Sequence, residues 1–197
     1  MSKKRAATGF KGLVLAPVTT NTLVSYVTGA GVDLPYAGSM SRTAKESTTD
    51  LYYDDELYAQ LKDVMGEDVE LRMAEVPLET MADLGLGTYD SETDTLEADF
   101  NITGKEYSLR FVVDTVSGLP FYFNYRVFQL TGIRFDNFVT KKDSVTVCEV
   151  ILTGVLKRPN LPGLMPWMVA QLKDDRSNQA ACAALLTAAE TKPTPAS

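Results

Sequence analysis

The segment from Gly38 to Tyr53 has no face that could lie against a hydrophobic core. It carries few large apolar residues, and serine and threonine are dense along it. In a strand, one face would hold Met40, Arg42, Ala44, Glu46, Thr48 and Asp50, and the other Ser39, Ser41, Thr43, Lys45, Ser47 and Thr49. The pattern predicts a long polar strand or hairpin arm. Such an arm persists only where something pairs with it or covers it, which indicates neighbouring subunits.

A strongly acidic run overlaps this segment. Between Glu46 and Asp99 there are seventeen acidic residues and two basic ones, Lys62 and Arg72. Apolar residues are threaded through the run: Tyr52, Tyr53, Leu57, Tyr58, Leu61, Val64, Val69, Leu71, Met73, Val76 and Leu78. That much apolar surface favours folding, so the acids should lie on the face of a packed object.

The charge is polarised along the chain. The net charge is −7, yet residues 1–12 carry four basic residues and no acid. This distribution indicates surfaces with different neighbours. A length of 197 residues fits one large domain, or a domain with appendages. We expect neither a signal peptide nor a membrane anchor, and we expect Cys148 and Cys182 to be small buried side chains without a disulfide.

Local patterns favour a mainly β fold. We expect strands at 13–18, 23–27, 69–76, 107–113, 121–131, 134–139 and 145–156. We expect helices at 78–85, 164–172 and 177–190, turn-rich chain at 89–104, and a frayed end at 191–197. The chain then divides into an N-terminal arm (1–12), a β domain (13–158) with a long loop or hairpin at 28–53, and a C-terminal extension (159–197).

The usual chemistry of enzymes is absent from the sequence. It has no histidine, no cysteine cluster, no phosphate-binding loop and no nucleophile motif, so we expect no cofactor, no metal and no enzymatic activity. Asp54, Asp55 and Glu56 could form an acid/base pair, and they or Glu67 with Asp68 could bind a divalent cation. Adjacent carboxylates at the end of a strand are more often solvated surface.

Two other groups of residues allow a binding role. The basic cluster Lys3, Lys4 and Arg5 could contact nucleic acid, or an acidic surface on a like subunit. The aromatic residues Tyr122, Phe123, Tyr125 and Phe128 could stack on bases. We expect instead that these aromatic side chains are strand residues shared between a core and a subunit contact.

Two stretches resemble the major tail proteins, or tail tube proteins, of bacteriophages with long non-contractile tails. Thr48-Thr49-Asp50-Leu51-Tyr52-Tyr53-Asp54-Asp55 is similar to that family's T-x-x-L-Y-A-D-D stretch. The run Val69-Glu70-Leu71-Arg72-Met73-Ala74-Glu75-Val76-Pro77-Leu78-Glu79 is similar to its V-E-L-x-V-A-D-L-P-L-E stretch. The resemblance covers roughly residues 12–158, and the C-terminal extension has no counterpart in it.

The resemblance implies two packed antiparallel sheets, sandwich- or barrel-like, with one short flanking helix, here followed by a C-terminal helical extension. It implies hexameric rings stacked into a tube that conducts DNA, located in the virion tail and assembled in the host cytoplasm. The N-terminal arm and the loop at 32–47 would bridge rings. Partners would be other copies, tail proteins such as the tape measure and terminator, and DNA in transient passage.

On this hypothesis, acidic residues lining the lumen would repel DNA phosphates. The candidates are Asp54, Asp55, Glu56, Glu70 and Glu75. In a regular strand Glu70 and Glu75 lie on opposite faces, so at most one would face the pore. Candidates for subunit contacts are Lys3, Lys4, Arg5, Arg42 and Lys45. The alternative function is a monomeric β-sandwich that binds carbohydrate or a partner protein, and a carboxylate hydrolase ranks last.

Overall fold

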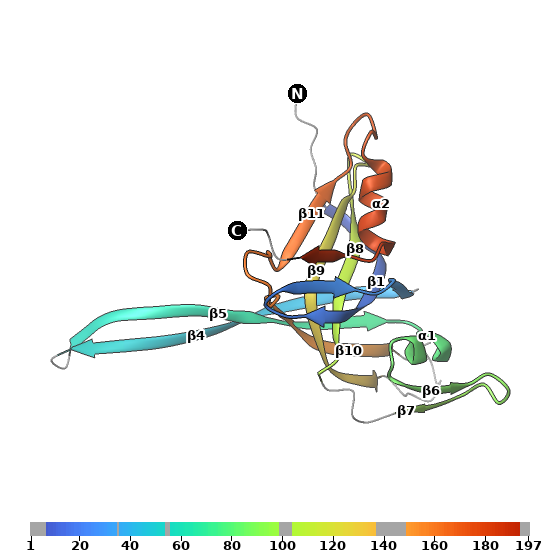
Figure 1. Ribbon diagram of the computed structural model, residues 1–197, viewed down its shortest axis with the longest axis horizontal. Coiled ribbons are helices and arrows are strands. Elements are labelled where there is room, and N and C mark those ends of the chain that lie inside the picture. Colours follow the sequence, from blue (N-terminus) through green and yellow to red (C-terminus); the bar gives the residue numbers. More distant parts are fainter. Residues whose placement is uncertain (1–6, 35, 54–55, 99–103, 137–148, 194–197) are drawn as a thin grey trace, which may run out of the picture.

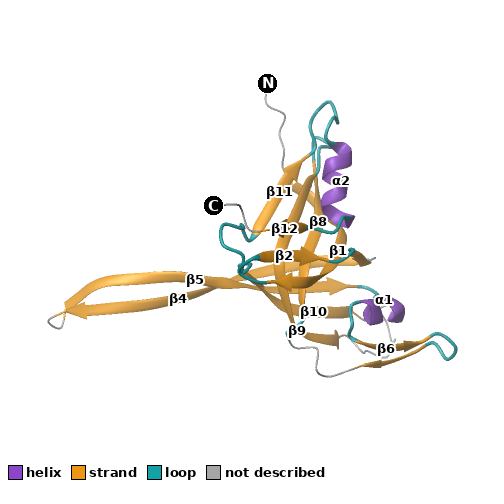
Figure 2. Ribbon diagram, in the orientation of Figure 1, coloured by secondary structure: helices purple, strands orange, loops and turns teal. Residues whose placement is uncertain are grey.

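The chain folds into a mainly β structure, as the sequence predicts, and it contains two short helices (Figure 1, Figure 2). The computed structural model describes residues 7–34, 36–53, 56–98, 104–136 and 149–193. The strands are β1 (Ala7–Asn21), β2 (Ser25–Thr28), β3 (Val32–Leu34), β4 (Ala37–Tyr53), β5 (Glu56–Met73), β6 (Gly87–Asp90), β7 (Thr95–Ala98), β8 (Glu106–Thr115), β9 (Phe121–Asp136), β10 (Glu149–Lys157), β11 (Trp167–Gln171) and β12 (Thr191–Pro193). The helices are α1 (Leu78–Asp83) and α2 (Gln179–Thr187).

One large antiparallel sheet forms the body. Its strands follow the order β1-β8-β9-β10-β5-β4, and β11 also pairs with β9. β3 pairs with β1 at one end of this order, while β4, the next strand in the sequence, pairs with β5 at the other end. The sheet therefore curls until its two ends meet at the β3–β4 segment. The far end of β1 joins β2 and β12 in a small second sheet.

The curled sheet encloses a hydrophobic core. β5 contributes Val69, Leu71 and Met73, all buried, while Glu70 and Arg72 point outward, as alternating side chains do in the strand expected at 69–76. The other core side chains come from β1, β3, β8, β9 and β10, from α1 and from the residues beside α1, and they include Leu13, Leu15, Leu34, Met81, Leu84, Leu109, Phe111, Phe128, Leu130, Leu152 and Leu156.

The helix α1 forms where it was expected, directly after Pro77. Proline is favoured at the start of a helix because the first backbone N–H groups have no acceptor within the helix. Glu79 lies in its first turn, and Met81 is buried against the core. The turn-rich chain that follows contains a small hairpin, β6–β7, which the sequence analysis missed.

The C-terminal extension is part of the same body. β11 pairs with the edge of β9 that β10 leaves open, and β12 pairs with β2. The helix α2 lies beside β8 and β9 in Figure 1, and it also contacts β1. The extension therefore closes strand edges within its own chain, and it is not a loose appendage.

A buried polar cluster fastens this extension to the sheet. Arg110, 1% exposed, donates to the carbonyl oxygens of Leu186 (3.1 Å) and Ala188 (2.7 Å) at the end of α2. It also donates to Thr28 Oγ1 (3.0 Å) and Ser108 Oγ (3.0 Å). Burial lowers the pKa of Arg110. These bonds stabilise the carbonyl end of α2, where an unpaired backbone acceptor would be costly.

Several expected elements differ from those observed. β1 begins at Ala7, so residues 7–12, expected in a free arm, form part of a strand paired with β8. β9 is one strand where two were expected, because it continues past Thr131 through a bulge opposite β10. Residues 167–171 are a strand and not part of a helix, and 191–193 are paired and not frayed. The helix expected at 177–190 is confirmed as α2.

Candidate assembly surface

The most prominent feature of the surface is a hairpin of β4 and β5 that extends well beyond the body (Figure 1). The two strands pair from Ala37 with Met73 to Tyr53 with Glu56. β10 accompanies β5 only from Met73 to Glu67. Within the part of the chain that the structure describes, residues 46–53 and 56–65 pair only with each other; we call 46–65 the arm. At about 3.3 Å per residue, the arm projects about 25 Å.

A bulge marks the point where the arm leaves the body. The register shifts where Lys45 pairs with Gly66 and Glu46 pairs with Val64. Gly66 has φ +148°, and a Cβ there would lie 2.5 Å from the carbonyl oxygen of Leu156. Only glycine allows this close approach of β5 to β10, so the residue sets the direction in which the arm departs.

Polar contacts join the base of the arm to the body. Arg42 pairs with Glu67 (3.2 Å), hydrogen-bonds the hydroxyl of Tyr125 and lies 5.4 Å from the centre of its ring. Lys45 pairs with Asp68 across the hairpin (2.8 Å). Arg42 and Lys45, which the sequence analysis assigned to subunit contacts, therefore form contacts within the chain. Both ion pairs are partly exposed, so each adds little stability.

One acidic candidate, Glu70, lies in a network of ion pairs. Glu70 pairs with Arg72 (2.6 Å) and Arg134 (3.1 Å), and Arg72 also pairs with Glu149 (3.2 Å). The carboxylates of Glu70 and Glu149 raise the pKa of Arg72. The charge of Glu70 is thus balanced by its neighbours on the outer face of the sheet.

The structure describes only some of the remaining candidate residues. Glu75 is exposed and follows the end of β5, so the strand expected at 69–76 stops at Met73. Glu56 is the first residue of β5, at the far end of the arm. Asp54 and Asp55, and the basic cluster Lys3, Lys4 and Arg5, lie outside the described residues, as does Cys148. Cys182 is buried and its thiol is free.

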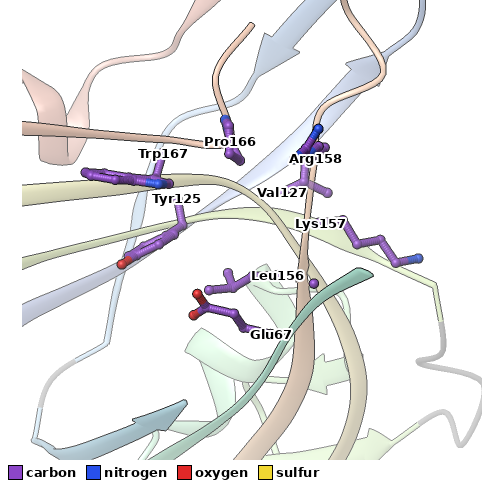
Figure 3. Close-up of a pocket in the computed structure, with 9 residues that line it drawn as sticks. Glu67, Tyr125, Val127, Leu156, Lys157, Arg158, Pro166 and Trp167 are labelled. Atoms are coloured by element: carbon purple, nitrogen blue, oxygen red, sulfur yellow. The ribbon is translucent and has the colours of Figure 1, made fainter. Parts of the chain in front are cut away.

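A groove opens beside the base of the arm. It has a volume of about 290 Å³, and its lining comes from β5, β9, β10 and the start of β11: Gly66, Glu67, Tyr125, Val127, Leu156, Lys157, Arg158, Pro166 and Trp167. Figure 3 shows Trp167 above Tyr125 on one side, with the carboxylate of Glu67 below them, and Lys157 extending to the other side. Sequence reasoning missed this groove because it placed Trp167 inside a helix.

A row of aromatic rings leads into the groove. Ring centres lie 5.1 Å apart for Phe10 and Phe111, 5.0 Å for Phe111 and Phe123, and 6.5 Å for both Phe123–Tyr125 and Tyr125–Trp167. Burial raises the pKa of the Tyr125 phenol. Phe128, grouped with these aromatics in the sequence analysis, is instead fully buried in the core.

Comparisons with known proteins do not assign this chain to a family. No protein-family model matches the sequence, and no curated protein matches it. Among the described residues, no helix is long and apolar enough to cross a membrane. The same residues contain no cluster of three or more side chains suited to holding a metal ion.

Proposed function

We propose that this chain is the structural subunit of a phage tail tube and assembles into stacked hexameric rings that conduct DNA. The observation that carries the proposal is the arm. It is a two-stranded ribbon that leaves the body and has no further strand on either edge among the described residues. An isolated two-stranded ribbon is marginally stable in water, and open edges pair readily with other chains.

The sequence around the arm supports the same function. The arm carries the first of the two stretches that resemble tail tube proteins, and β5 with α1 carries the second. The acidic excess between Glu46 and Asp99 would keep a passing polyanion from adhering, which a DNA conduit requires. Since Glu70 is balanced by arginines, Glu75 is the remaining candidate on the body for an acidic lining of the lumen.

The direct experiment is electron microscopy of the purified full-length chain across a concentration series. It should show rings or tubes of constant diameter, with or without an initiator protein. A chain that remains monomeric at the highest concentration and fails to enter a tube with any tail protein would overturn the proposal. Sedimentation velocity on the same samples separates true assembly from adsorption on the grid.

The aromatic row favours one other function. A monomeric module that binds carbohydrate would present aromatic rings beside a groove, as Tyr125 and Trp167 do here. This alternative requires no assembly. Titration of the monomer with oligosaccharides, followed by the fluorescence of Trp167, the single tryptophan, distinguishes it from the tube subunit.

A further inference from the structure

The groove beside the base of the arm has a large exposed apolar side chain, Trp167, in its lining. Trp167 is 53% exposed, and Met165, two residues away, is 68% exposed. Exposed apolar side chains that gather around a concavity mark contact sites more often than the same residues scattered singly. The groove is therefore a stronger candidate for a contact than the flat polar faces of the sheet.

The rim of the groove is basic. Lys157 and Arg158 are both exposed, and Arg158 forms no ion pair with any residue in the described ranges. Arg42 adds a third positive charge at the base of the arm, and Glu67 opposes it. A partner that suits this rim should be acidic, because opposite charges steer the encounter and fix its orientation.

One buried acceptor in the groove lacks a hydrogen bond. Glu67 Oε2 is shielded from solvent and lies 3.2 Å from Arg42 Nη1, yet it accepts no hydrogen bond with good geometry from any described residue. Arg42 balances the charge of this oxygen, but its capacity to accept a hydrogen bond is unused. A partner that brings a hydroxyl or a backbone N–H into the groove would supply the missing donor.

The arm of another copy has the matching chemistry. Residues 46–65 contain six acidic residues and one basic residue, Lys62. The same segment contains Leu51, Tyr52, Tyr53, Leu57 and Tyr58, whose side chains could lie against exposed aromatic rings and whose phenols could donate hydrogen bonds. It is thus both acidic and aromatic, as the groove requires.

Geometry makes this contact intermolecular. The groove lies at the root of the arm, with Gly66 and Glu67 in its lining, while the last described pair of the arm, Tyr53 with Glu56, is about 25 Å away along a paired ribbon. A ribbon of that kind does not fold back on its own root. Two different surfaces of one chain can then join copies head to tail, which produces a closed ring or an open helix.

We propose that the groove lined by Tyr125, Arg158 and Trp167 receives the end of the arm of a second copy. The inference rests on the proposed self-assembly and adds the site at which the arm binds. It assigns Asp54, Asp55 and Glu56 to a contact between subunits, in place of the lumen. The partner is identified by its charge and its tyrosines.

Photocrosslinking of the full-length chain tests the contact. A copy with p-benzoylphenylalanine in place of Trp167 is mixed with isotopically labelled wild-type chain, assembled, irradiated and analysed by mass spectrometry. Crosslinks to residues 46–65 of the labelled copy support the inference. Tubes that form but crosslink elsewhere overturn it and leave the proposed function intact, whereas failure of both chains to assemble overturns both. The same probe at Val116, an exposed site in the β8–β9 turn, is the control.

Charge reversal provides a second test without a probe. Arg158→Glu should raise the concentration needed for assembly by about tenfold or more, because the acidic arm then meets a negative rim. Adding Asp55→Lys to the same chain should restore assembly in part. Lys173→Glu, at another exposed basic residue, should leave assembly unchanged. Equal assembly of the Arg158→Glu and Lys173→Glu variants would contradict the inference.

Discussion

Arg126 and Glu190 form an almost buried ion pair, with 3.0 Å between Arg126 Nη2 and Glu190 Oε1. Their side chains are 6% and 12% exposed. Arg126 also donates to the carbonyl oxygen of Met165 (2.6 Å), and Asn124 donates to the second oxygen of Glu190 (3.2 Å). This pair joins the middle of β9 to the chain just before β12, so it fastens the C-terminal extension to the body.

Glu190→Gln should destabilise the protein by about 3 kcal/mol or more, because it leaves the guanidinium of Arg126 buried without its counter-charge. Urea unfolding followed by circular dichroism measures the loss. Asp114→Asn is the matched control, since it removes the exposed pair with Lys11 and should cost less than about 1 kcal/mol. Equal losses in the two variants would show that the burial of the Arg126 pair has no energetic consequence.

Gly154→Ala should destabilise the body by about 1–3 kcal/mol, or prevent folding. A Cβ at this position would overlap the ring of Phe128 and lie 2.5 Å from the carbonyl oxygen of Gln129. Gly9→Ala is the control, because a Cβ there meets nothing within 4 Å. Thermal unfolding of both variants tests the prediction, which fails if their midpoints agree.

Stability should fall at alkaline pH, in part through Tyr107. Burial raises the pKa of its phenol from 10.0 to about 12, and its hydroxyl donates to the carbonyl oxygen of Leu84. Between these values the unfolded chain has lost the phenol proton while the folded chain keeps it. The contribution of Tyr107 to the free energy of unfolding is therefore complete below pH 10. It is lost as the pH rises towards 12, a change of about 3 kcal/mol.

Tyr107→Phe removes this titration. The variant should be less stable than wild type at pH 8, through the lost hydrogen bond, but its stability should decline less steeply above pH 10. Some decline should remain, because burial also raises the pKa of Tyr26. Urea unfolding between pH 8 and pH 12 measures both slopes, and parallel curves for the two proteins would rule out the assigned role of Tyr107.

Excision of the arm should separate folding from assembly. Replacing residues 46–65 by Asn-Gly joins Lys45 to Gly66, which already pair, through a turn suited to a two-residue hairpin. Since every core side chain that the structure describes lies outside the arm, the thermal midpoint should change little. Sedimentation should then show a folded monomer at concentrations where the full chain assembles. Tubes formed by the excised chain would refute an essential role for the arm.

The elements predicted correctly are those whose signal is local. The alternation from Val69 to Met73, the proline before α1 and the alanine-rich run of α2 each need only a few neighbouring residues to specify a conformation. The polar pattern of Gly38–Tyr53 likewise predicted a long strand, and β4 has those bounds almost unchanged. The absence of a core face was wrong at the root of the strand, where Met40 packs against the core. The acidic bias of the arm was also evident from sequence.

The incorrect predictions involve contacts between distant residues. A helical spacing relates Leu164, Met168 and Leu172. However, β9 has an open edge at Phe121–Tyr125, and residues 167–171 form a strand that pairs with this edge. Thr131 and Gly132 suggested a break, but pairing with β10 carries β9 through them as a bulge. The unpaired backbone N–H and C=O groups of one strand thus decide the conformation of another segment. A local sequence pattern contains no information about such a distant partner.

The sequence by itself determined a mainly β chain, a polar arm and a strongly acidic surface, because these follow from composition and from the period of side chains along a strand. Tertiary structure decided that β4 pairs with β5 of its own chain, that Arg42 and Lys45 fasten the root of the arm, and that the C-terminal extension closes the sheet through Arg110 and Arg126. It also brought Tyr125, Arg158 and Trp167 together in one groove. Such arrangements depend on the three-dimensional path of a curled sheet, which places residues far apart in sequence within contact distance.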